Sequence, residues 1–445
     1  MTTLRIAWLL SRRTASDRST VVLPVVAFAV VTALLLIVCG GAQAFFTWTG
    51  QTAFLYQLLA VVALALLIVP LVALGGSAAR LSARRRDDRL ASLRLLGATP
   101  ATVGALTVIE STVLAIAGAL VGVVVSVAVS PLVGLIPFRG EPLGTSVLLA
   151  PILVVAAVLA IALLAAVSAV VGLRSVIVSP LGVRTKQVAP PMHWVRVVIG
   201  VVVVAVTFAA MNAIQLAAGF GIVLTVLAVG FGGTLAVLGL VGPWVIRLVA
   251  SGQAKRAKTV KKLLAARGIL ESPKAAWRQV SGVAMTSFMA VFAGVGVALL
   301  GMMSENGQLD RESLQLYADI RTGVIITVVA SFLMVACSVG VNQASAVLDR
   351  RELYVSLDRL GMPVETMNAA RGRAVLSPLR ITTIGSAVVA AVVIFPLTGY
   401  VLLVRPATIA MIVGCLATGI LIVWLGLLAT RPVLARVLAD RSPSL

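Results

Sequence analysis

The sequence predicts an all-α polytopic membrane protein with ten transmembrane helices. The chain has 445 residues, of which 60% are hydrophobic and only 11% are charged, and its mean hydropathy is +1.11. A soluble domain carries about 25% charged residues. Apolar windows long enough to cross a hydrocarbon core of about 30 Å recur along the whole chain. These observations exclude a soluble globular protein.

Ten apolar segments are predicted to span the membrane. The run that begins at Val21 is longer than the 7 to 15 apolar residues, roughly, of a signal peptide, so we expect it to remain as a span. An even number of spans places both termini on one side of the membrane. The segments lie near residues 21–42, 54–76, 102–131, 147–172, 196–216, 219–246, 280–302, 322–342, 374–398 and 406–429.

The distribution of basic residues supports this topology. The formal net charge is +21, from 36 Lys and Arg against 15 Asp and Glu. When the loops are assigned alternately to two sides, 32 of these 36 basic residues fall on one side. Because Lys and Arg in short loops stay in the cytoplasm, we predict cytoplasmic termini in a bacterial cytoplasmic membrane. Topology thus explains the positive charge without nucleic acid. The other side receives only Arg139, Arg311, Arg321 and Arg405.

The sequence shows no metal site, cofactor site or catalytic residues. Cys39, Cys337 and Cys415 all lie within predicted spans and lack metal-ligand spacing. The phosphate-binding loop G-x-x-x-x-G-K-[ST] is missing from the sequence. We therefore predict a chain that is not itself an enzyme and that binds no cofactor or metal.

The loops after the second and eighth predicted spans repeat each other at an offset of 264 residues. Basic amphipathic helices, predicted at residues 4–13 and 261–278, precede the two halves. Both halves enter the membrane from the same side, which predicts parallel pseudo-repeats. In the two loops, Arg86, Asp88, Ser92, Leu93, Leu96 and Gly97 correspond to Arg350, Glu352, Ser356, Leu357, Leu360 and Gly361.

A 4+2+4 order of spans follows from the repeat. The predicted domains are a first four-span unit at residues 1–172, a linker and central two-span hairpin at 173–250, and a second four-span unit at 251–445. Gly118 and Gly122 in the third span are spaced to let two helices approach closely.

Each repeated loop is predicted to form a short amphipathic helix on the cytoplasmic face. Its leucines recur at three- and four-residue spacing, and Gly97 or Gly361 follows as a C-terminal stop. Such a helix can dock a partner, although an ordinary interfacial helix with snorkelling arginines fits the same pattern. The apolar positions are Leu90, Leu93 and Leu96 in the first loop and Leu353, Leu357 and Leu360 in the second.

Three further features have both a functional and a plain interpretation. Glu110 is the only acidic residue placed inside a span; such residues are candidates for function, but a hydrogen bond to a neighbouring helix also explains it. The basic residues between Lys255 and Lys262 either bind anionic lipid headgroups or set the topology. Aromatic side chains near the outer ends of the first two spans form a vestibule or an aromatic belt: Phe45, Phe46, Trp48, Phe54 and Tyr56.

The pattern R-x-[DE]…LR-x-LG-A-T between Arg86 and Thr99, followed by a span containing Ile109-Glu110-Ser111, resembles the FtsX-like (MacB-type) permeases of ABC transporters. Residues 350–361 resemble a second copy, and residues 265–273 resemble the amphipathic helix that opens such a unit. The plan is similar to the duplicated bacitracin-resistance-type permeases. The large external domain of that branch is missing, because residues 303–321 are too few to form it.

This resemblance implies a permease subunit that works with two copies of a cytoplasmic ABC ATPase, where ATP and Mg²⁺ would bind. The expected task is export or extraction of a hydrophobic or amphipathic substrate, such as an antimicrobial peptide, drug or lipid, by a lever-like movement. Export of such a substrate would give the protein a role in efflux and antimicrobial resistance. The substrate-binding residues stay unknown, and the presence of an accessory membrane subunit stays an open question. The implied ATPase-coupling residues are Arg86, Asp88, Leu90, Leu93, Leu96, Gly97, Arg350, Glu352, Leu353, Leu357, Leu360 and Gly361.

Two other functions stay open. A non-transporting module would pass ATPase motion to an external enzyme or a sensor kinase, although the short outer loops offer little surface for such a partner. An ion-driven secondary transporter would need several intramembrane carboxylates, whereas the predicted spans contain one.

Overall fold

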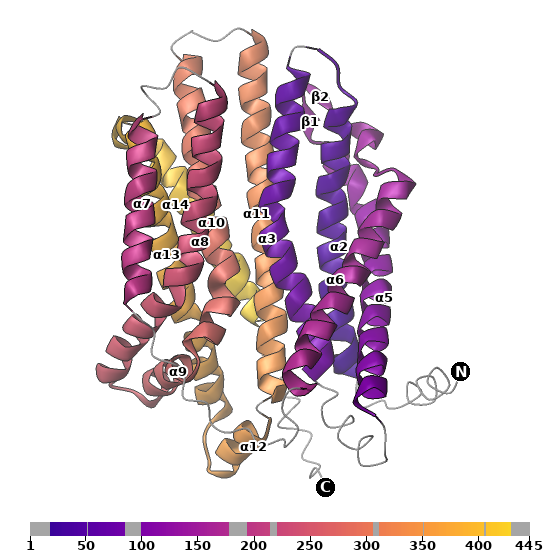
Figure 1. The fold of residues 1–445 in the computed structure, drawn as a ribbon, viewed down its shortest axis with the longest axis vertical. Coiled ribbons are helices and arrows are strands. Elements are labelled where there is room, and N and C mark those ends of the chain that lie inside the picture. The colour runs from indigo at the N-terminus through magenta and orange to yellow at the C-terminus, as the bar shows by residue number, and fades with distance from the viewer. Residues whose placement is uncertain are drawn as a thin grey trace. The chain divides into compact units, whose positions relative to one another are not determined.

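A computed structural model describes residues 18–50, 52–84, 99–177, 194–213, 220–305, 311–349, 351–404 and 406–428. These residues are mostly helical, and the chain divides into two compact units, Met1–Gln187 and Val188–Leu445 (Figure 1). Each unit has its own core of packed helices.

Unit 1 contains four long helices. α2 packs most extensively on α5 and also contacts α3, while α6 contacts α3 and α5 (Figure 1). α5 begins after Thr99, whose Oγ1 accepts a hydrogen bond of 3.3 Å from the backbone N–H of Thr102. Pro100 takes the first helical position, where its missing N–H costs nothing. The helices are α2 (Arg18–Phe46), α3 (Ala53–Arg84), α5 (Pro100–Gly134) and α6 (Pro151–Ile177).

The contact between α2 and α5 depends on two glycines. A Cβ atom at Gly118 would lie 2.7 Å from the carbonyl oxygen of Val25, and a Cβ at Gly122 would lie 2.6 Å from that of Ala29. Both distances are too short for real contacts, so only glycine lets the backbones approach this closely. The close packing predicted for Gly118 and Gly122 is confirmed.

A small cap joins the last turns of α5 to the start of α6. β1 (Pro137–Phe138) pairs antiparallel with β2 (Glu141–Pro142), and the 3₁₀-helix η2 (Gly144–Val147) follows and packs on α2 and α5. Arg139 and Gly140 form the turn between the strands, with φ angles of 53° and 81°. Two positive φ angles in a two-residue loop are typical of a type I′ hairpin.

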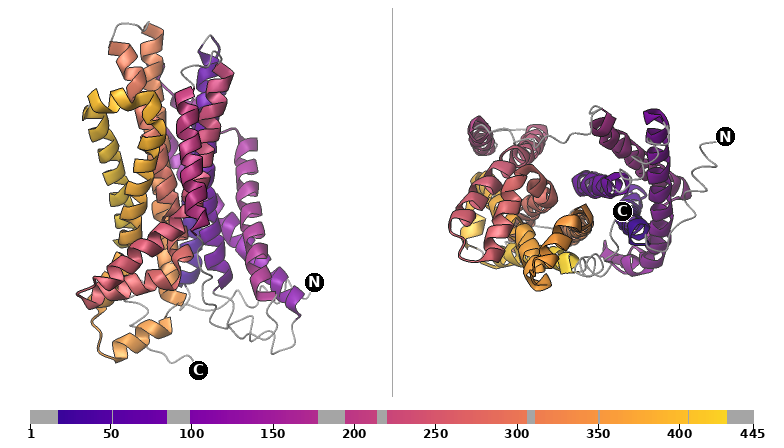
Figure 2. Two further views of the ribbon diagram at one scale, coloured as in Figure 1. Left: turned by 60° about the vertical axis from the view of Figure 1, so that its left-hand side comes forward. Right: turned by 90° about the horizontal axis from the view of Figure 1, so that it is seen from below.

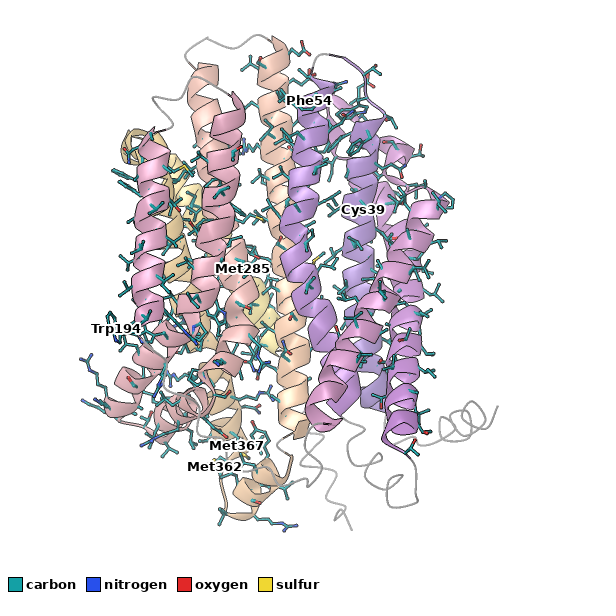
Figure 3. The ribbon with its side chains drawn as sticks, viewed as in Figure 1. Cys39, Phe54, Trp194, Met285, Met362 and Met367 are labelled. Atoms are coloured by element: carbon teal, nitrogen blue, oxygen red, sulfur yellow. The ribbon has the colours of Figure 1, made fainter. Side chains whose placement is uncertain are left out.

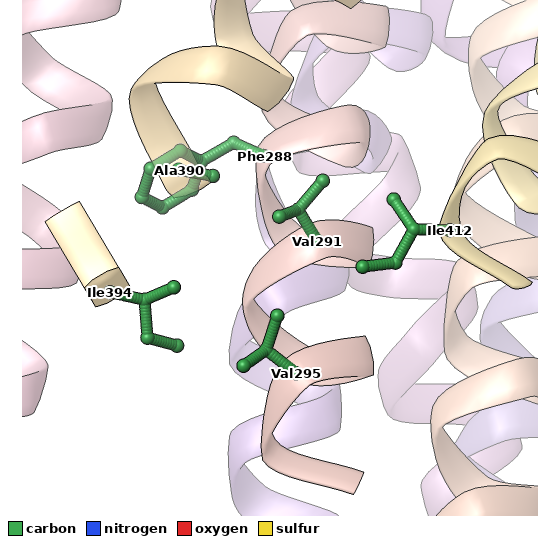
Figure 4. Packing of buried hydrophobic residues seen from close by; sticks show 6 residues of the cluster. All are labelled: Phe288, Val291, Val295, Ala390, Ile394 and Ile412. Carbon is green, nitrogen blue, oxygen red and sulfur yellow. The ribbon is translucent and has the colours of Figure 1, made fainter. Parts of the chain in front are cut away.

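Unit 2 contains eight helices among the described residues. α10 lies at its centre and contacts α8, α11, α13 and α14. Phe288, Val291 and Val295 of α10 form a buried cluster with Ala390, Ile394 and Ile412 (Figure 4). α13 and α14 lie side by side, as the left view of Figure 2 shows. The helices are α7 (Val195–Ala213), α8 (Phe220–Lys255), α9 (Val260–Glu271), α10 (Pro273–Glu305), α11 (Arg311–Asp349), α12 (Arg351–Arg359), α13 (Val364–Val404) and α14 (Pro406–Leu428).

The two units repeat one pattern of helix pairing. In unit 1 the first long helix packs most extensively on the third and also on the second, and the second contacts the fourth. The helices α10, α11, α13 and α14 make the same pairs in unit 2. The predicted central hairpin, α7 and α8, contacts α9, α10 and α13 and therefore lies within unit 2.

Nine helices within the described residues are long and apolar enough to cross a membrane. They coincide with the first nine predicted spans. The tenth predicted span coincides with α14, whose apolar stretch, Ile412–Leu428, falls below that length among the described residues. A multi-pass, largely helical membrane protein is thus observed, and the ten-span count and the orientation of the termini stay predictions.

The predicted amphipathic helix at 261–278 is interrupted. α9 ends at Glu271 and α10 begins at Pro273, so residues 273–278 form the first turns of a long membrane helix. Ser272, which precedes the proline, has φ −148° and ψ 78°, because the proline ring disfavours the helical conformation at the residue before it. The other predicted amphipathic helix, at 4–13, lies outside the described residues.

The predicted outer loop at 303–321 is mostly helical. α10 continues to Glu305 and α11 begins at Arg311, so only five residues separate the two helices. α11 has 39 residues and is therefore about 58 Å long, well beyond the bilayer core of about 30 Å. The helices stay in contact near their ends, where a Cβ at Gly301 would lie 2.9 Å from the Tyr317 hydroxyl.

Candidate functional site

The second repeated loop folds into the short helix α12, as the leucine spacing predicted. It lies at the end of unit 2 that also carries α9 (Figure 1). Tyr354 and Leu357 of this helix pack against Val347 of α11 and Met367 of α13. α12 is therefore attached to the two long helices that flank it in the sequence.

Gly361 ends α12 in a Schellman motif. Its φ angle of +79° is one that glycine adopts without strain. The N–H of Gly361 donates to the Asp358 carbonyl at 2.9 Å, and the N–H of Met362 donates to the Leu357 carbonyl at 3.0 Å. Met362 packs in the same cluster as Leu357, and Figure 3 shows Met362 close to Met367. This contact is the hydrophobic part of the motif, and the predicted glycine stop is confirmed.

The apolar residues of the second repeated loop divide into an anchor and an exposed pair. Leu357 of α12 is half-buried in the anchor, whereas the side chains of Leu353 in α12 and of Leu360 just after it are 49% and 82% exposed. Exposed leucines beside an anchored residue favour docking of a partner. Glu352 lies within α12. The remaining predicted coupling residues lie outside the described residues: Arg86, Asp88, Leu90, Leu93, Leu96, Gly97 and Arg350.

Glu110 lies on an exposed face of α5. It is ten residues after Pro100, or about 15 Å along the helix, and its neighbours Ile109 and Val113 are also exposed. The side chain is thus at the surface of unit 1 rather than in its helical core. A carboxyl group within an apolar span costs free energy in lipid, so Glu110 keeps its place as a candidate residue.

Basic side chains gather where α8 meets α9. Lys255, Arg256, Lys258, Lys261 and Lys262 are all exposed. The buried face of α9 consists of Ala265, Ala266 and Ile269, and α9 packs against α8 and α13. Figure 3 shows Trp194, the exposed residue that precedes α7, at the same end of unit 2. Binding of anionic lipid headgroups and a role in setting the topology were the two interpretations of this segment, and both stay predictions.

Aromatic side chains cluster around Arg139, which the sequence did not predict. The Arg139 guanidinium carbon lies 4.6 Å from the Trp48 ring centre and 5.0 Å from that of Tyr56. Arg139 also donates to the Thr49 carbonyl at 3.4 Å and to Thr52 Oγ1 at 3.1 Å. This set fixes the cap between α5 and α6 to the turn between α2 and α3.

Two more aromatic rings complete this cluster. Phe45 packs against Trp48, Tyr56 and Phe138 with ring centres 4.9 to 5.9 Å apart. Phe46 and Phe54, in contrast, are exposed, and Figure 3 shows Phe54 at the start of α3. The five aromatic residues grouped in the sequence prediction thus divide into a packed cluster, Phe45, Trp48 and Tyr56, and an exposed pair.

Comparison with protein families gives one match. Residues 60–181 match the family model of the FtsX-like permease C-terminal region. The match supports the FtsX-like permease family. The FtsX-like segment lies within unit 1 and includes most of α3, all of α5 and α6, Glu110, and the first repeated loop. Comparison with curated proteins gives no match. The MacB-type and bacitracin-type subdivisions stay predictions.

Proposed function

We propose that the protein is the permease subunit of an ABC transporter, and that it couples ATP hydrolysis on separate ATPase subunits to movement of a hydrophobic or amphipathic substrate. The FtsX-like match in unit 1 and the multi-pass helical structure support the permease class. The sequence lacks a phosphate-binding loop, which supports placing ATP and Mg²⁺ on a partner chain.

The observation that carries this proposal is the construction of α12. Tyr354 and Leu357 of this helix and Met362 just after it pack against α11 and α13, while Leu353 and Leu360 beside them are exposed. A load applied to the exposed leucines would therefore pass directly to two membrane-spanning helices. Lever-like coupling requires this property of a docking element.

The sequence repeat supports two ATPase subunits. The loop that contains Arg86 and Gly97 repeats the residues of the α12 loop at an offset of 264. Two repeated docking elements in one chain would suit a pair of identical partners. The positive-inside distribution supports a cytoplasmic position for both loops, where a soluble ATPase would meet them.

The short connection between α10 and α11 supports a substrate that arrives from the bilayer. Only residues 306–310 separate these helices, and five residues cannot form the external domain of bacitracin-type permeases. The exposed face of α5 that carries Glu110 would offer a contact surface to an amphipathic molecule within the membrane. We therefore favour export or extraction of such a molecule, as in antimicrobial resistance.

Co-purification with a candidate ABC ATPase tests the docking assignment. We expect Leu353→Asp and Leu360→Asp to reduce complex formation by at least about tenfold, since loss of a central apolar contact costs more than about 1.4 kcal/mol. Leu263→Asp on α9 is the matched control, because Leu263 is also an exposed leucine of unit 2 outside α12. If all three variants bind the ATPase as well as the unmodified protein does, α12 is not the docking element and the proposal loses its basis.

ATP hydrolysis in liposomes separates transport from signalling. For a transporter, we expect an amphipathic peptide or hydrophobic drug to stimulate the ATPase activity of the complex, and Leu353→Asp to abolish the stimulation. A water-soluble analogue of the same compound is the control. Hydrolysis that no membrane-partitioning compound changes, but that an external enzyme or sensor kinase does change, would favour the non-transporting module.

A further inference from the structure

Four hydroxyl groups in the core of unit 2 have no hydrogen-bond partner among the described residues. They belong to Thr286 and Ser287 of α10, Ser331 of α11 and Thr383 of α13. None of these side chains is more than 1% exposed. A buried hydroxyl without a partner is unfavourable, and native proteins contain few of them.

Other buried hydroxyls in the bundle bond to their own helix. Thr32 Oγ1 donates to the Phe28 carbonyl at 2.8 Å, and Thr234 Oγ1 donates to the Gly230 carbonyl at 2.7 Å. Ser386, one turn beyond Thr383, donates to the Thr383 carbonyl at 3.1 Å. Helical backbone therefore offers partners in this protein, and the four hydroxyls leave them unused.

Ser287 and Ser331 lie at the same height in the bundle. A Cβ at Gly282 of α10 would lie 2.8 Å from Val335 Cγ2 of α11, which fixes the register of the two antiparallel helices. Ser287 is five residues beyond Gly282, and Ser331 is four residues before Val335. Ser287 is also 14 residues, or about 21 Å, from the start of α10, near the middle of the helix.

Thr383 extends this polar region along α13. Ala390 packs in one cluster with Phe288, the neighbour of Ser287 (Figure 4). Thr383 is seven residues before Ala390, or about 10 Å nearer to the end of unit 2 that carries α12. Towards that same end, Gln343 donates to Gln279 Oε1 at 3.0 Å between α11 and α10. Polar groups thus continue from that end to the middle of the bundle.

Unit 1 has apolar residues at two of the equivalent positions. At the repeat offset of 264, Ser331 corresponds to Leu67 and Thr383 to Ala119. Both unit 1 residues are buried, with 1% and 0% exposure. Because the same helix pairs pack in both units, a packing requirement common to the repeats does not explain the hydroxyls of Ser331 and Thr383.

We propose that the hydroxyls of Thr286, Ser287, Ser331 and Thr383 bind ordered water inside unit 2. Each hydroxyl both donates and accepts a hydrogen bond, and none of the four side chains is charged, so the set suits a small neutral ligand with the same capacity. A buried water makes about three hydrogen bonds to groups that otherwise lack partners. Such water would let α10, α11 and α13 exchange partners as they move. The proposal does not depend on the proposed function.

Radiolytic footprinting of the full-length protein in its membrane tests this inference. An X-ray pulse converts water to hydroxyl radicals, which oxidise side chains beside that water, and mass spectrometry measures the rate at each residue. Met334 lies one turn from Ser331, and Phe288 follows Ser287. Met211 of α7 and Phe28 of α2 are matched controls, because all four side chains are 0% exposed.

We expect Met334 and Phe288 to be oxidised about tenfold faster than Met211 and Phe28, because only the first pair would lie beside bound water. The double variant Ser287→Ala, Ser331→Ala should then bring Met334 to the rate of Met211. Equal, slow oxidation of all four residues in the unmodified protein would overturn the proposal. A fast rate at Met334 that the double variant leaves unchanged would overturn the role of the hydroxyls.

Discussion

Two consecutive glycines near the C-terminal end of α2, Gly40 and Gly41, should respond in opposite directions to alanine. A Cβ atom at Gly40 would overlap the carbonyl oxygen of Val147 in η2, whereas a Cβ at Gly41 would have nothing within 4 Å. The two positions share a helix, a depth and a residue type. They differ only in what the added methyl group meets, so each variant is the control for the other.

The structure sets the size of the expected difference. Replacing a helical glycine by alanine stabilises the helix by up to about 1 kcal/mol, and Gly41→Ala should show this gain in full. Gly40→Ala gains the same amount but must displace η2, and overpacking of this kind costs about 1–3 kcal/mol. Moving η2 also strains the bond of 2.9 Å from the Ala150 N–H to Gln43 Oε1, which contributes about 1 kcal/mol.

Thermal unfolding in one detergent measures the comparison. The unfolding temperature of Gly41→Ala should lie above that of the unmodified protein, and that of Gly40→Ala should lie below it. The free energies of unfolding of the two variants should differ by about 1–4 kcal/mol. A Gly40→Ala protein at least as stable as Gly41→Ala would refute the close approach of η2 to α2, and with it the described position of the cap between α5 and α6.

Three further predictions concern single positions. Thr99→Ala should destabilise the start of α5 by about 1 kcal/mol through loss of its N-cap, measured by thermal unfolding, and Thr99→Ser should not. Arg139→Ala should lower the free energy of unfolding by about 1–2 kcal/mol because its contacts with Trp48 and Tyr56 are lost. Arg139→Gly should cost less, since glycine relieves the φ of 53°. Gly361→Ala should speed hydrogen exchange in α12 by about fivefold, because alanine at φ +79° costs about 1 kcal/mol, and Gly361→Asn should exchange more slowly than Gly361→Ala.

The helices were predictable from the sequence because hydropathy directly reports the need to cross lipid. The first nine predicted spans coincide with membrane-length helices in the described residues. The helix ends were harder to predict. Residues 311–321 were assigned to a loop because they carry Glu312, Asp319 and Arg321, yet α11 begins at Arg311. Charge shows where the apolar segment ends, but a helix can continue into water beyond that point.

The candidate site was predictable as far as local spacing determines it. The leucine pattern and Gly361 specified α12 and its end, since both are properties of neighbouring residues. Which leucines face the protein was not predictable, because Leu357 is held by residues of α11 and α13. Arg139 was missed for the same reason: Trp48 and Thr52 are 91 and 87 residues away in the chain, and no periodic pattern connects them.

The duplicated helix pair shows how one fold can take up two chemistries. Gly118 and Gly122 of α5 correspond to Thr382 and Ser386 of α13 at the repeat offset of 264, and all four are small residues. In unit 1 the glycines bring two backbones into contact. In unit 2 the hydroxyls of Thr382 and Ser386 donate hydrogen bonds to carbonyl groups of their own helix. Thr382 Oγ1, for example, donates to the Leu379 carbonyl at 3.0 Å. Small size preserves the pairing of the first and third helices in both units, while hydroxyl groups in place of hydrogen atoms make the core of unit 2 polar. The repeat therefore constrains the size of the residues at this contact and leaves their polarity free to differ.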